Sequence, residues 1–457
     1  MENLIGQLPE KWDQITLGEA CARGGGDIQT GPFGSQLHVA DYVGVGIPSI
    51  MPQNIGDNRV IESGIARITP EDAKRLKRYL VRTGDIVYSR RGDVERRALI
   101  RETEDGWLCG TGCLRVRFGD GDVNRRYASY YLGHPSVREW IVRHAHGATM
   151  PNLNTSILSA LPFVAPPIDV QNIIAHILGS LDDMIELNRR MNETLEAMAQ
   201  AIFKSWFVDF DPVRAKMSGE PPESICGRLG LTPEILDLFP DRLQDSEIGE
   251  IPEGWEVKPF SETIQIIGGG TPNTFIDEYW DGDIPWFSVV DAPNESDVFV
   301  IDTEKKISQT GLDNSSAKLL SKGTTIISAR GTVGKLALAG NPMAMNQSCY
   351  GLWGVCAGPF FTFYAARQLV SQLKQHSHGA VFDTITRDTF ASVNVVTSIG
   401  PIADVFEATI GTLMRRIYVN LVQSHSLSFI RDALLPKLLS GELQVTNTKK
   451  FIADDAA

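Results

Sequence analysis

Three stretches of the sequence resemble the motifs with which enzymes bind nucleotides, transfer methyl groups or cut DNA. Residues 331–335 read GTVGK, like the end of a phosphate-binding P-loop, but Ala329 stands in the place of the first glycine and Leu336 replaces the Ser or Thr that follows the lysine. Residues 341–344 begin like the NPPY motif of amino-methyltransferases and then diverge. We therefore expect neither a phosphate cradle nor an S-adenosylmethionine site in this chain.

The third stretch resembles a nuclease motif. Residues 240–241 followed by residues 256–258 mimic the PD…ExK pattern, but they lie in an acid-rich region where short matches arise by chance. The six cysteines form no CxxC pair, and no histidine cluster accompanies them. Because neither a metal-ligand spacing nor a Ser-His-Asp constellation is present, we predict no catalytic residue, no disulfide and no metal.

Charge is distributed unevenly along the 457 residues. The formal net charge is −13, yet residues 59–101 hold twelve Lys and Arg against six Asp and Glu. Residues 219–256 hold ten acidic residues against two arginines, which is typical of a linker. A local basic stretch permits nucleic-acid binding in an acidic protein, and a solvated charged face is the alternative interpretation.

The chain has no run of the roughly 18–20 apolar residues that a membrane span needs. Its first residues carry neither a basic nor an apolar targeting segment. We therefore expect a cytoplasmic protein without membrane contact, built from two to four domains at about 100–200 residues each.

The two halves of the chain repeat each other. Four short matches occur in the same order, with offsets of 243, 239, 232 and 234 residues. The matched pairs are residues 8–12 with 251–255, 84–92 with 323–331, 146–149 with 378–381, and 167–168 with 401–402. Each half contains short β-branched runs between Gly and Pro turns, followed by a long helix that proline opens.

The long helices carry a hydrophobic repeat with alternating steps of four and three residues, which is typical of a coiled coil. In the first helix the repeat consists of Val170, Ile174, Ile177, Leu181, Met184, Asn188, Met191, Leu195, Met198 and Ile202. A shift of 232 residues gives Ile402, Phe406, Thr409, Leu413, Arg416, Asn420, Gln423, Leu427, Ile430 and Leu434, with a register uncertain by two residues and with Ile417 beside it as a neighbour that could take up burial. We predict that the helices pack on each other and that Asn188 and Asn420 fix their register; each helix packing on its own domain is the alternative.

This order of features resembles the specificity subunit of type I restriction-modification systems. Besides the repeated segments and helix ends, the resemblance rests on residues 31–37 (GPFGSQL) and 147–154 (GATMPNLN). The second half departs from it, with residues 268–272 (GGGTP) and 381–384 (VFDT) at the corresponding places, which implies that the two domains read different sequences.

The resemblance implies an α+β fold: two mixed α/β target-recognition domains separated by two long antiparallel coiled-coil helices, with a pseudo-two-fold internal repeat. The expected boundaries are 1–166 and 251–399 for the recognition domains, 167–208 and 400–440 for the spacer helices, 209–250 for an acidic linker with one short helix near 233–238, and 441–457 for a flexible tail.

The same resemblance implies a non-catalytic chain that binds a bipartite target in double-stranded DNA. Two modification subunits would carry S-adenosylmethionine and methylate adenine, and restriction subunits would use ATP and Mg²⁺, so this chain itself needs no cofactor. We expect the modification subunits to dock on residues 202–207 and 434–439, with burial of these residues inside the helix pair as the alternative. A stand-alone DNA-modifying enzyme and a purely structural coiled-coil adaptor remain rival interpretations.

Base edges and phosphates are bound by Arg, Lys, Gln, Asn, Ser and Thr side chains and by backbone N–H groups close to glycine. We favour residues 89–91 as base readers and residues 31–36 as a source of N–H groups for phosphate. The basic residues Lys74, Arg75, Lys77, Arg78, Arg96 and Arg97 fit phosphate contacts better. The complete set of candidate DNA contacts is Gly31, Phe33, Ser35, Gln36, Ser89, Arg90, Arg91, Arg96, Arg97, Thr149, Asn152, Thr271, Arg330 and Thr332.

Overall fold

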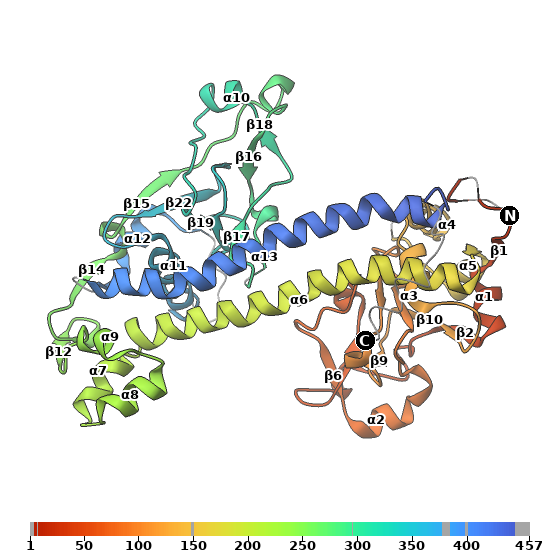
Figure 1. The fold of residues 1–457 in the computed structure, drawn as a ribbon, viewed down its shortest axis with the longest axis horizontal. Coiled ribbons are helices and arrows are strands. Elements are labelled where there is room, and N and C mark those ends of the chain that lie inside the picture. Colours follow the sequence, from red (N-terminus) through yellow and green to blue (C-terminus); the bar gives the residue numbers. More distant parts are fainter. Residues whose placement is uncertain are drawn as a thin grey trace. The chain divides into compact units, whose positions relative to one another are not determined.

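The computed structural model describes residues 4–6, 8–147, 150–294, 296–376, 384–397 and 401–443. The chain divides into two compact units, Met1–Met184 with Leu427–Ala457, and Ile185–Ser426. Each unit contains part of both long helices, α6 (Ile168–Phe207) and α13 (Pro401–Leu439) (Figure 1). No helix in the described ranges has the length and apolar character that crossing a bilayer requires.

The first unit is built on a five-stranded sheet. Its strand order is β2 (Gly25–Thr30), β10 (Cys113–Gly119), β7 (Ile86–Ser89), β8 (Arg97–Leu99) and β5 (Asp57–Asn58). A second sheet has the order β3 (Tyr42–Val43), β6 (Ala66–Ile68), β4 (Ile47–Ile50) and β9 (Leu108–Cys109), and β1 (Asp13–Thr16) pairs with β11 (Pro162–Ala165). The helices are α1 (Leu17–Arg23), α2 (Pro70–Arg75), α3 (Arg125–Tyr131), α4 (Pro135–His144) and α5 (Thr155–Ala160).

The second unit repeats this topology. Its five-stranded sheet has the order β15 (Ile264–Gly268), β22 (Cys349–Gly354), β19 (Thr325–Ser328), β20 (Leu336–Ala339) and β17 (Phe299–Val300). Three further strands, β18 (Lys306–Ile307), β16 (Ile284–Phe287) and β21 (Ala344–Met345), form a sheet, and β14 (Glu256–Pro259) pairs with β23 (Asn394–Thr397). The helices are α10 (Gln309–Asp313), α11 (Pro359–His376), which packs on β22, and α12 (Arg387–Ser392). The internal repeat predicted from the sequence is therefore confirmed.

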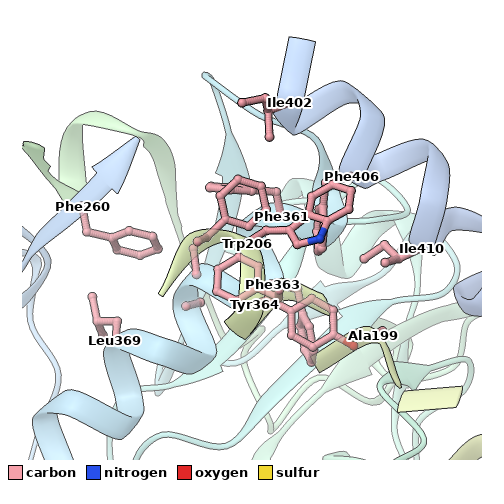
Figure 2. Packing of buried hydrophobic residues seen from close by; sticks show 14 of the residues in the cluster. Ala199, Trp206, Phe260, Phe361, Phe363, Tyr364, Leu369, Ile402, Phe406 and Ile410 are labelled. Atoms are coloured by element: carbon pink, nitrogen blue, oxygen red, sulfur yellow. The ribbon is translucent and has the colours of Figure 1, made fainter. Parts of the chain in front are cut away.

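Aromatic side chains join three helices in the core of the second unit. Trp206 of α6 and Phe361 of α11 lie next to Phe406 of α13, with ring centroids 6.0 and 6.3 Å from that of Phe406 (Figure 2). The ring of Phe203, also on α6, lies 5.7 Å from Phe406. Because burying an aromatic ring removes a large apolar area from water, this cluster is a main source of stability in the unit. The long helices thus pack on each other and on α11, which confirms the predicted pairing.

The pairing of α6 and α13 is antiparallel and contains buried amides. The Asn188 Nδ2 donates to Ser424 Oγ at 3.2 Å, and the Asn420 Nδ2 donates to Asn192 Oδ1 at 2.9 Å. Asn188, Asn192 and Asn420 are all buried. A buried amide is stable only where a partner satisfies it, so this arrangement disfavours other registers. The role of Asn188 and Asn420 in fixing the register stays a prediction, and Asn192 was missed.

The faces that the helices bury differ from the predicted repeat at several positions. Met184 and Met198 are exposed, as are Thr409, Arg416, Gln423 and Ile430. The buried positions on α13 lie one residue later, at Ile410 and Ile417. The expected repeat was therefore wrong at these positions, although Ile417 had been named as a neighbour that could take up burial, because α6 and α13 also pack on their domains and turn a wider face inward than a two-helix repeat requires.

The predicted docking segments at the helix ends are buried at their last apolar residues. Phe203, Trp206 and Phe207 belong to the core of the second unit, and Leu438 and Leu439 belong to the core of the first. The apolar ends are thus mostly buried, in the cores of the two units rather than only between the two helices, while Lys204, Pro436 and Lys437 are exposed. Docking of a partner at these ends stays a prediction.

The acidic region 209–250 was predicted as a linker with one short helix near 233–238; that helix is present, but the prediction of a linker was wrong. It forms α7 (Asp211–Met217), α8 (Pro222–Leu229) and α9 (Pro233–Asp237), followed by a hairpin of β12 (Leu243–Ser246) and β13 (Gly249–Pro252). Its apolar residues pack into the same core as Trp206; they are Phe210, Val213, Ile225, Leu231, Leu236 and Phe239. The acidic side chains cover the outer surface of this small subdomain.

Glu407 on α13 makes the stability of the second unit depend on pH. Its Oε1 accepts the N–H of Phe361, in the first turn of α11, at 2.6 Å, and Gly358 lacks the side chain that would block this approach. Burial raises the pKa of the Glu407 carboxyl from 4.5 to about 7, although the backbone N–H groups of Phe361 and Phe360 act in the opposite direction.

Between about pH 4.5 and pH 7 the folded chain therefore holds a proton at Glu407 that the unfolded chain has released. Stability from this proton is complete below pH 4.5 and is lost as the pH rises through 7. Glu407→Gln keeps the acceptor oxygen without the charge, so the variant should gain stability relative to the wild type between pH 5 and pH 8 in urea unfolding. The exposed Glu253→Gln is the control, and a Glu407→Gln difference that does not change with pH contradicts the assignment.

Candidate nucleic-acid interface

A tight turn after β7 carries the arginines that the sequence singled out. The Ser89 hydroxyl donates to the Arg91 carbonyl at 2.9 Å, and Gly92 has a φ of +74°, which favours glycine. The Arg90 N–H donates to the Gly112 carbonyl at 2.8 Å. These bonds close the turn and leave the Arg91 side chain exposed.

Two distant segments meet this turn. The N–H of Leu153 donates to the Arg90 carbonyl at 2.8 Å, and Asn152 forms a bridge with Arg91. The Arg90 guanidinium lies 5.9 Å from the centre of the Phe33 ring, and that side chain is 54% exposed. The structure thus brings residues 31–36, the turn and the segment after Met150 together at one place, while Thr149 lies outside the described residues.

Gln36 connects the loop at residues 31–36 to the basic residues 74–78. Its Oε1 accepts from the Phe33 N–H at 3.2 Å and from the Tyr79 hydroxyl at 2.8 Å, and its carbonyl accepts from Arg75 at 2.9 Å. Arg78 stacks over the Tyr79 ring at 4.5 Å. The exposed cations Lys74, Arg75, Lys77 and Arg78 are therefore held beside the loop that carries Phe33 and the exposed Ser35. Tyr79 was not predicted, since nothing in its sequence context marks a contact with Gln36.

Three of the predicted contacts are corrected by the structure. Ser89 is 2% exposed and its hydroxyl closes the turn, and Gly31 is buried with its N–H bonded to the Cys113 carbonyl at 2.9 Å. Arg97 is 6% exposed, and its Nε donates to the Ser129 carbonyl at 2.8 Å. Burial lowers the pKa of Arg97, and Gly133 leaves room for its guanidinium. These three groups are buried and hydrogen-bonded within the fold, so they are not exposed for contact with DNA.

The second unit has the same turn with different neighbours. Ser328 Oγ donates to the Thr332 carbonyl, the Ile385 N–H donates to the Ala329 carbonyl at 2.9 Å, and Arg330 bridges Thr384. Arg330 and Thr332 are exposed. Because β19 and β20 flank this turn as a hairpin, residues 331–335 lack the strand-loop-helix context of a P-loop.

A glycine-rich segment takes the place of the Phe33 loop in the second unit. The Gly270 carbonyl accepts from the Trp286 indole at 2.9 Å, and the Thr271 hydroxyl donates to the Gln347 side chain. The neighbouring Ser348 carbonyl accepts from Ala329 N–H at 2.7 Å, which links this segment to the turn. Gln347 was not predicted, because only the fold brings it next to Thr271.

Comparison with known proteins identifies the repeated domain. The sequence model of the type I restriction modification DNA specificity domain matches residues 9–197 and 252–397. The chain belongs to this family. The two matches fall on the two halves of the internal repeat, so each turn described above lies in its own specificity domain.

Curated relatives are similar over nearly their whole length. The HindI specificity subunit of Haemophilus influenzae is 28% identical over 87% of this chain and 95% of its own. The MjaIX specificity subunit of Methanocaldococcus jannaschii is 24% identical over 97% and 96%. The crystal structure of a type I restriction-modification S subunit from M. genitalium covers 96% of this chain and 98% of its own, with a TM-score of 0.52 and 15% identity, which supports the shared fold.

The different burial of two adjacent arginines gives a direct test of the corrected site. Arg97→Gln removes a buried, hydrogen-bonded charge and should lower stability by about 2 kcal/mol, or the melting temperature by roughly 5 °C. Arg96→Gln, which removes an exposed partner of Asp93, should leave the melting temperature within about 1 °C. A normal melting temperature of Arg97→Gln together with lost DNA binding would instead make Arg97 a DNA contact.

Proposed function

We propose that the chain reads a bipartite target in double-stranded DNA, one part with each specificity domain, and directs adenine methylation or restriction by partner subunits. The observation that supports this most strongly is the pair of matching turns, which present Arg91 in one unit and Arg330 in the other. An exposed arginine on a hydrogen-bonded turn suits bidentate contact with guanine, the most common base-specific contact in the major groove.

The surroundings of the two arginines support different base preferences. Arg91 lies beside Arg90, and the Arg90 guanidinium lies over the ring of Phe33. Arg330 has Thr332 close to it in the same turn. Because base selection depends on the donors, acceptors and apolar groups that reach the groove, we infer that the two domains recognise unlike sequences.

Phosphate contacts would position the first domain on the duplex. The exposed side chains of α2 and the turn that follows it supply cations; they are Lys74, Lys77 and Arg78, the last of which also stacks on Tyr79. Such contacts add affinity that falls with salt and carry no sequence information. This local charge offsets the net charge of −13 where DNA would lie.

Methylation and cleavage would belong to other polypeptides. We propose two modification subunits that bind S-adenosylmethionine and restriction subunits that use ATP and Mg²⁺, and a cytoplasmic location stays a prediction. Since most of the large apolar side chains at the helix ends are buried, the exposed apolar residues Leu187 of α6 and Val419 of α13, 60% and 51% exposed, are better candidates for docking the modification subunits.

The separate roles of the two turns can be tested by mapping methylated bases in DNA modified by the complete complex. The wild type should modify a motif with two parts. Arg91→Gln should weaken selection in one part and Arg330→Gln in the other, each by roughly tenfold or more at the affected base pair, because a lost bidentate contact costs about 1–3 kcal/mol.

Arg96→Gln is the matched control, since loss of a phosphate contact should lower modification evenly without altering the motif. If both turn variants changed the same part of the motif, or if neither changed it, the assignment of one turn to each part would be wrong.

A further inference from the structure

Each unit presents one more exposed side chain close to its arginine turn, the name used here for residues 89–92 in the first unit and 328–332 in the second. In the first unit this side chain is Gln53, in the short 3₁₀ turn η2 (Pro52–Asn54) that follows β4. In the second unit it is Val290, in the 3₁₀ turn η7 (Val289–Asp291) that follows β16. Val290 is 73% exposed.

Matching hydrogen bonds show that η2 and η7 occupy equivalent places in the two domains. The Ile50 carbonyl at the end of β4 accepts the Gly110 N–H at 2.9 Å, and the Phe287 carbonyl at the end of β16 accepts the Asn346 N–H at 2.9 Å. β4 pairs in parallel with β9, as β16 does with β21. In both units the exposed side chain lies three residues beyond the accepting carbonyl.

η2 lies against the arginine turn of the first unit. A Cβ added to Gly112 would lie 3.3 Å from the Cγ of Pro52, so the proline ring is in contact with this glycine. The Gly112 carbonyl accepts the Arg90 N–H at 2.8 Å. Gln53 directly follows the proline that makes this contact, which places it beside the turn that presents Arg91.

A chain of hydrogen bonds joins η7 to the arginine turn of the second unit. It starts at Asn346, which is bonded to the last residue of β16 as described above. The Asn346 side chain accepts the Ser348 N–H at 3.0 Å, and the Ser348 carbonyl accepts the Ala329 N–H at 2.7 Å. Ala329 directly precedes Arg330. Each 3₁₀ turn is therefore fixed relative to the arginine that its own domain presents.

Both 3₁₀ turns are held by side-chain hydrogen bonds on either side of their middle residue. In η2 the Met51 N–H donates to Asn54 Oδ1 at 3.2 Å, and the buried Asn54 amide donates to the Ile61 carbonyl at 3.0 Å. In η7 the N–H and hydroxyl of Ser288 donate to Asp291 Oδ2 at 2.8 and 2.9 Å. A side chain on such a preorganised turn loses little backbone entropy on binding.

We propose that Gln53 and Val290 each determine one further base pair of the target, Gln53 by binding adenine and Val290 by contacting the methyl group of thymine. A glutamine amide donates and accepts, which matches N6 and N7 of adenine in the major groove. A valine cannot form hydrogen bonds, but it packs on the thymine methyl, the apolar group that the major groove offers. The inference rests on the proposed function, because it adds one base pair to each part of the target.

A difference between the domains at this place also fits their different base preferences. The main-chain bonds around η2 and η7 are alike, whereas the exposed side chain changes from an amide to an aliphatic group. Single exposed apolar residues are common on protein surfaces, so exposure of Val290 alone would carry little weight. Its equivalence to Gln53 and its position beside the arginine turn carry the argument.

The test maps methylated bases in DNA modified by the complete complex. Gln53→Ala and Val290→Gln change the two proposed contacts. Gln14→Ala is the control for the first unit, since Gln14 is exposed on β1, outside the five-stranded sheet. Val355→Gln is the control for the second unit, since Val355 is 60% exposed and follows the end of β22 that lies away from the arginine turn.

Gln53→Ala should lower selection for adenine about tenfold at one base pair, in the part of the motif that Arg91→Gln also alters. Val290→Gln should change the preference from thymine to adenine at one base pair, in the part that Arg330→Gln alters. Both controls should reproduce the wild-type motif. All these variants should keep the wild-type melting temperature, because the substituted side chains are exposed.

The inference is overturned for either residue whose variant leaves the motif as its control does, or alters the other part of it. Modification that falls evenly at all sites would also overturn it, because that result indicates a phosphate contact. Arg91→Gln and Arg330→Gln report separately on the proposed function. If they altered one part each while Gln53→Ala and Val290→Gln altered none, the proposed function would stand without this inference. A wild-type complex that modified no two-part motif would contradict both.

Discussion

Both compact units depend on residues from the two long helices α6 and α13. The first unit needs residues from the end of the chain: Arg431 donates to Asp182 of α6 at 2.8 Å, and Leu438 and Leu439 fill the core around Ile174. The second unit needs the later part of α6, because Phe203 and Trp206 pack on Phe406. Each compact unit therefore includes residues of both long helices in its core.

Buried polar contacts between α6 and α13 favour one register of the two helices, whereas apolar contacts alone would allow several. Leu and Ile side chains would tolerate a shift of one helical turn, but such a shift would separate the Asn420 Nδ2 from Asn192 Oδ1, which accepts its hydrogen bond. Breaking a buried hydrogen bond costs about 1–3 kcal/mol, whereas sliding apolar surfaces costs less. A defined register matters for a protein whose two domains read one target. The turn that carries Arg91 and the turn that carries Arg330 must each be held in a fixed position on the core of its own unit.

Sequence periodicity and repetition predicted the fold better than they predicted the site. The helices were visible from their apolar repeat and the two domains from matched segments, since both signals are carried by the chain itself. Region 209–250 was misjudged because its acidic surface hides apolar residues such as Phe210 and Leu236, which only the folded core brings together.

Residue type alone also cannot separate a structural arginine from a functional one. Arg91 and Arg97 look alike in sequence, yet a turn exposes the first while the sheet and Ser129 enclose the second. In the same way Gln36 was chosen as a DNA contact, and the structure shows that it also holds Phe33, Arg75 and Tyr79 in place. Contacts between segments far apart in the chain decide these roles.

A double-mutant cycle on Asn192 and Asn420 tests the central claim most directly. The free energy of unfolding is measured for Asn192→Ala, Asn420→Ala, the double variant and the wild type. If the buried amide contact holds the two helices in one register, the two substitutions should be coupled by about 1–2 kcal/mol. Additive effects, with a coupling below about 0.3 kcal/mol, would contradict the account.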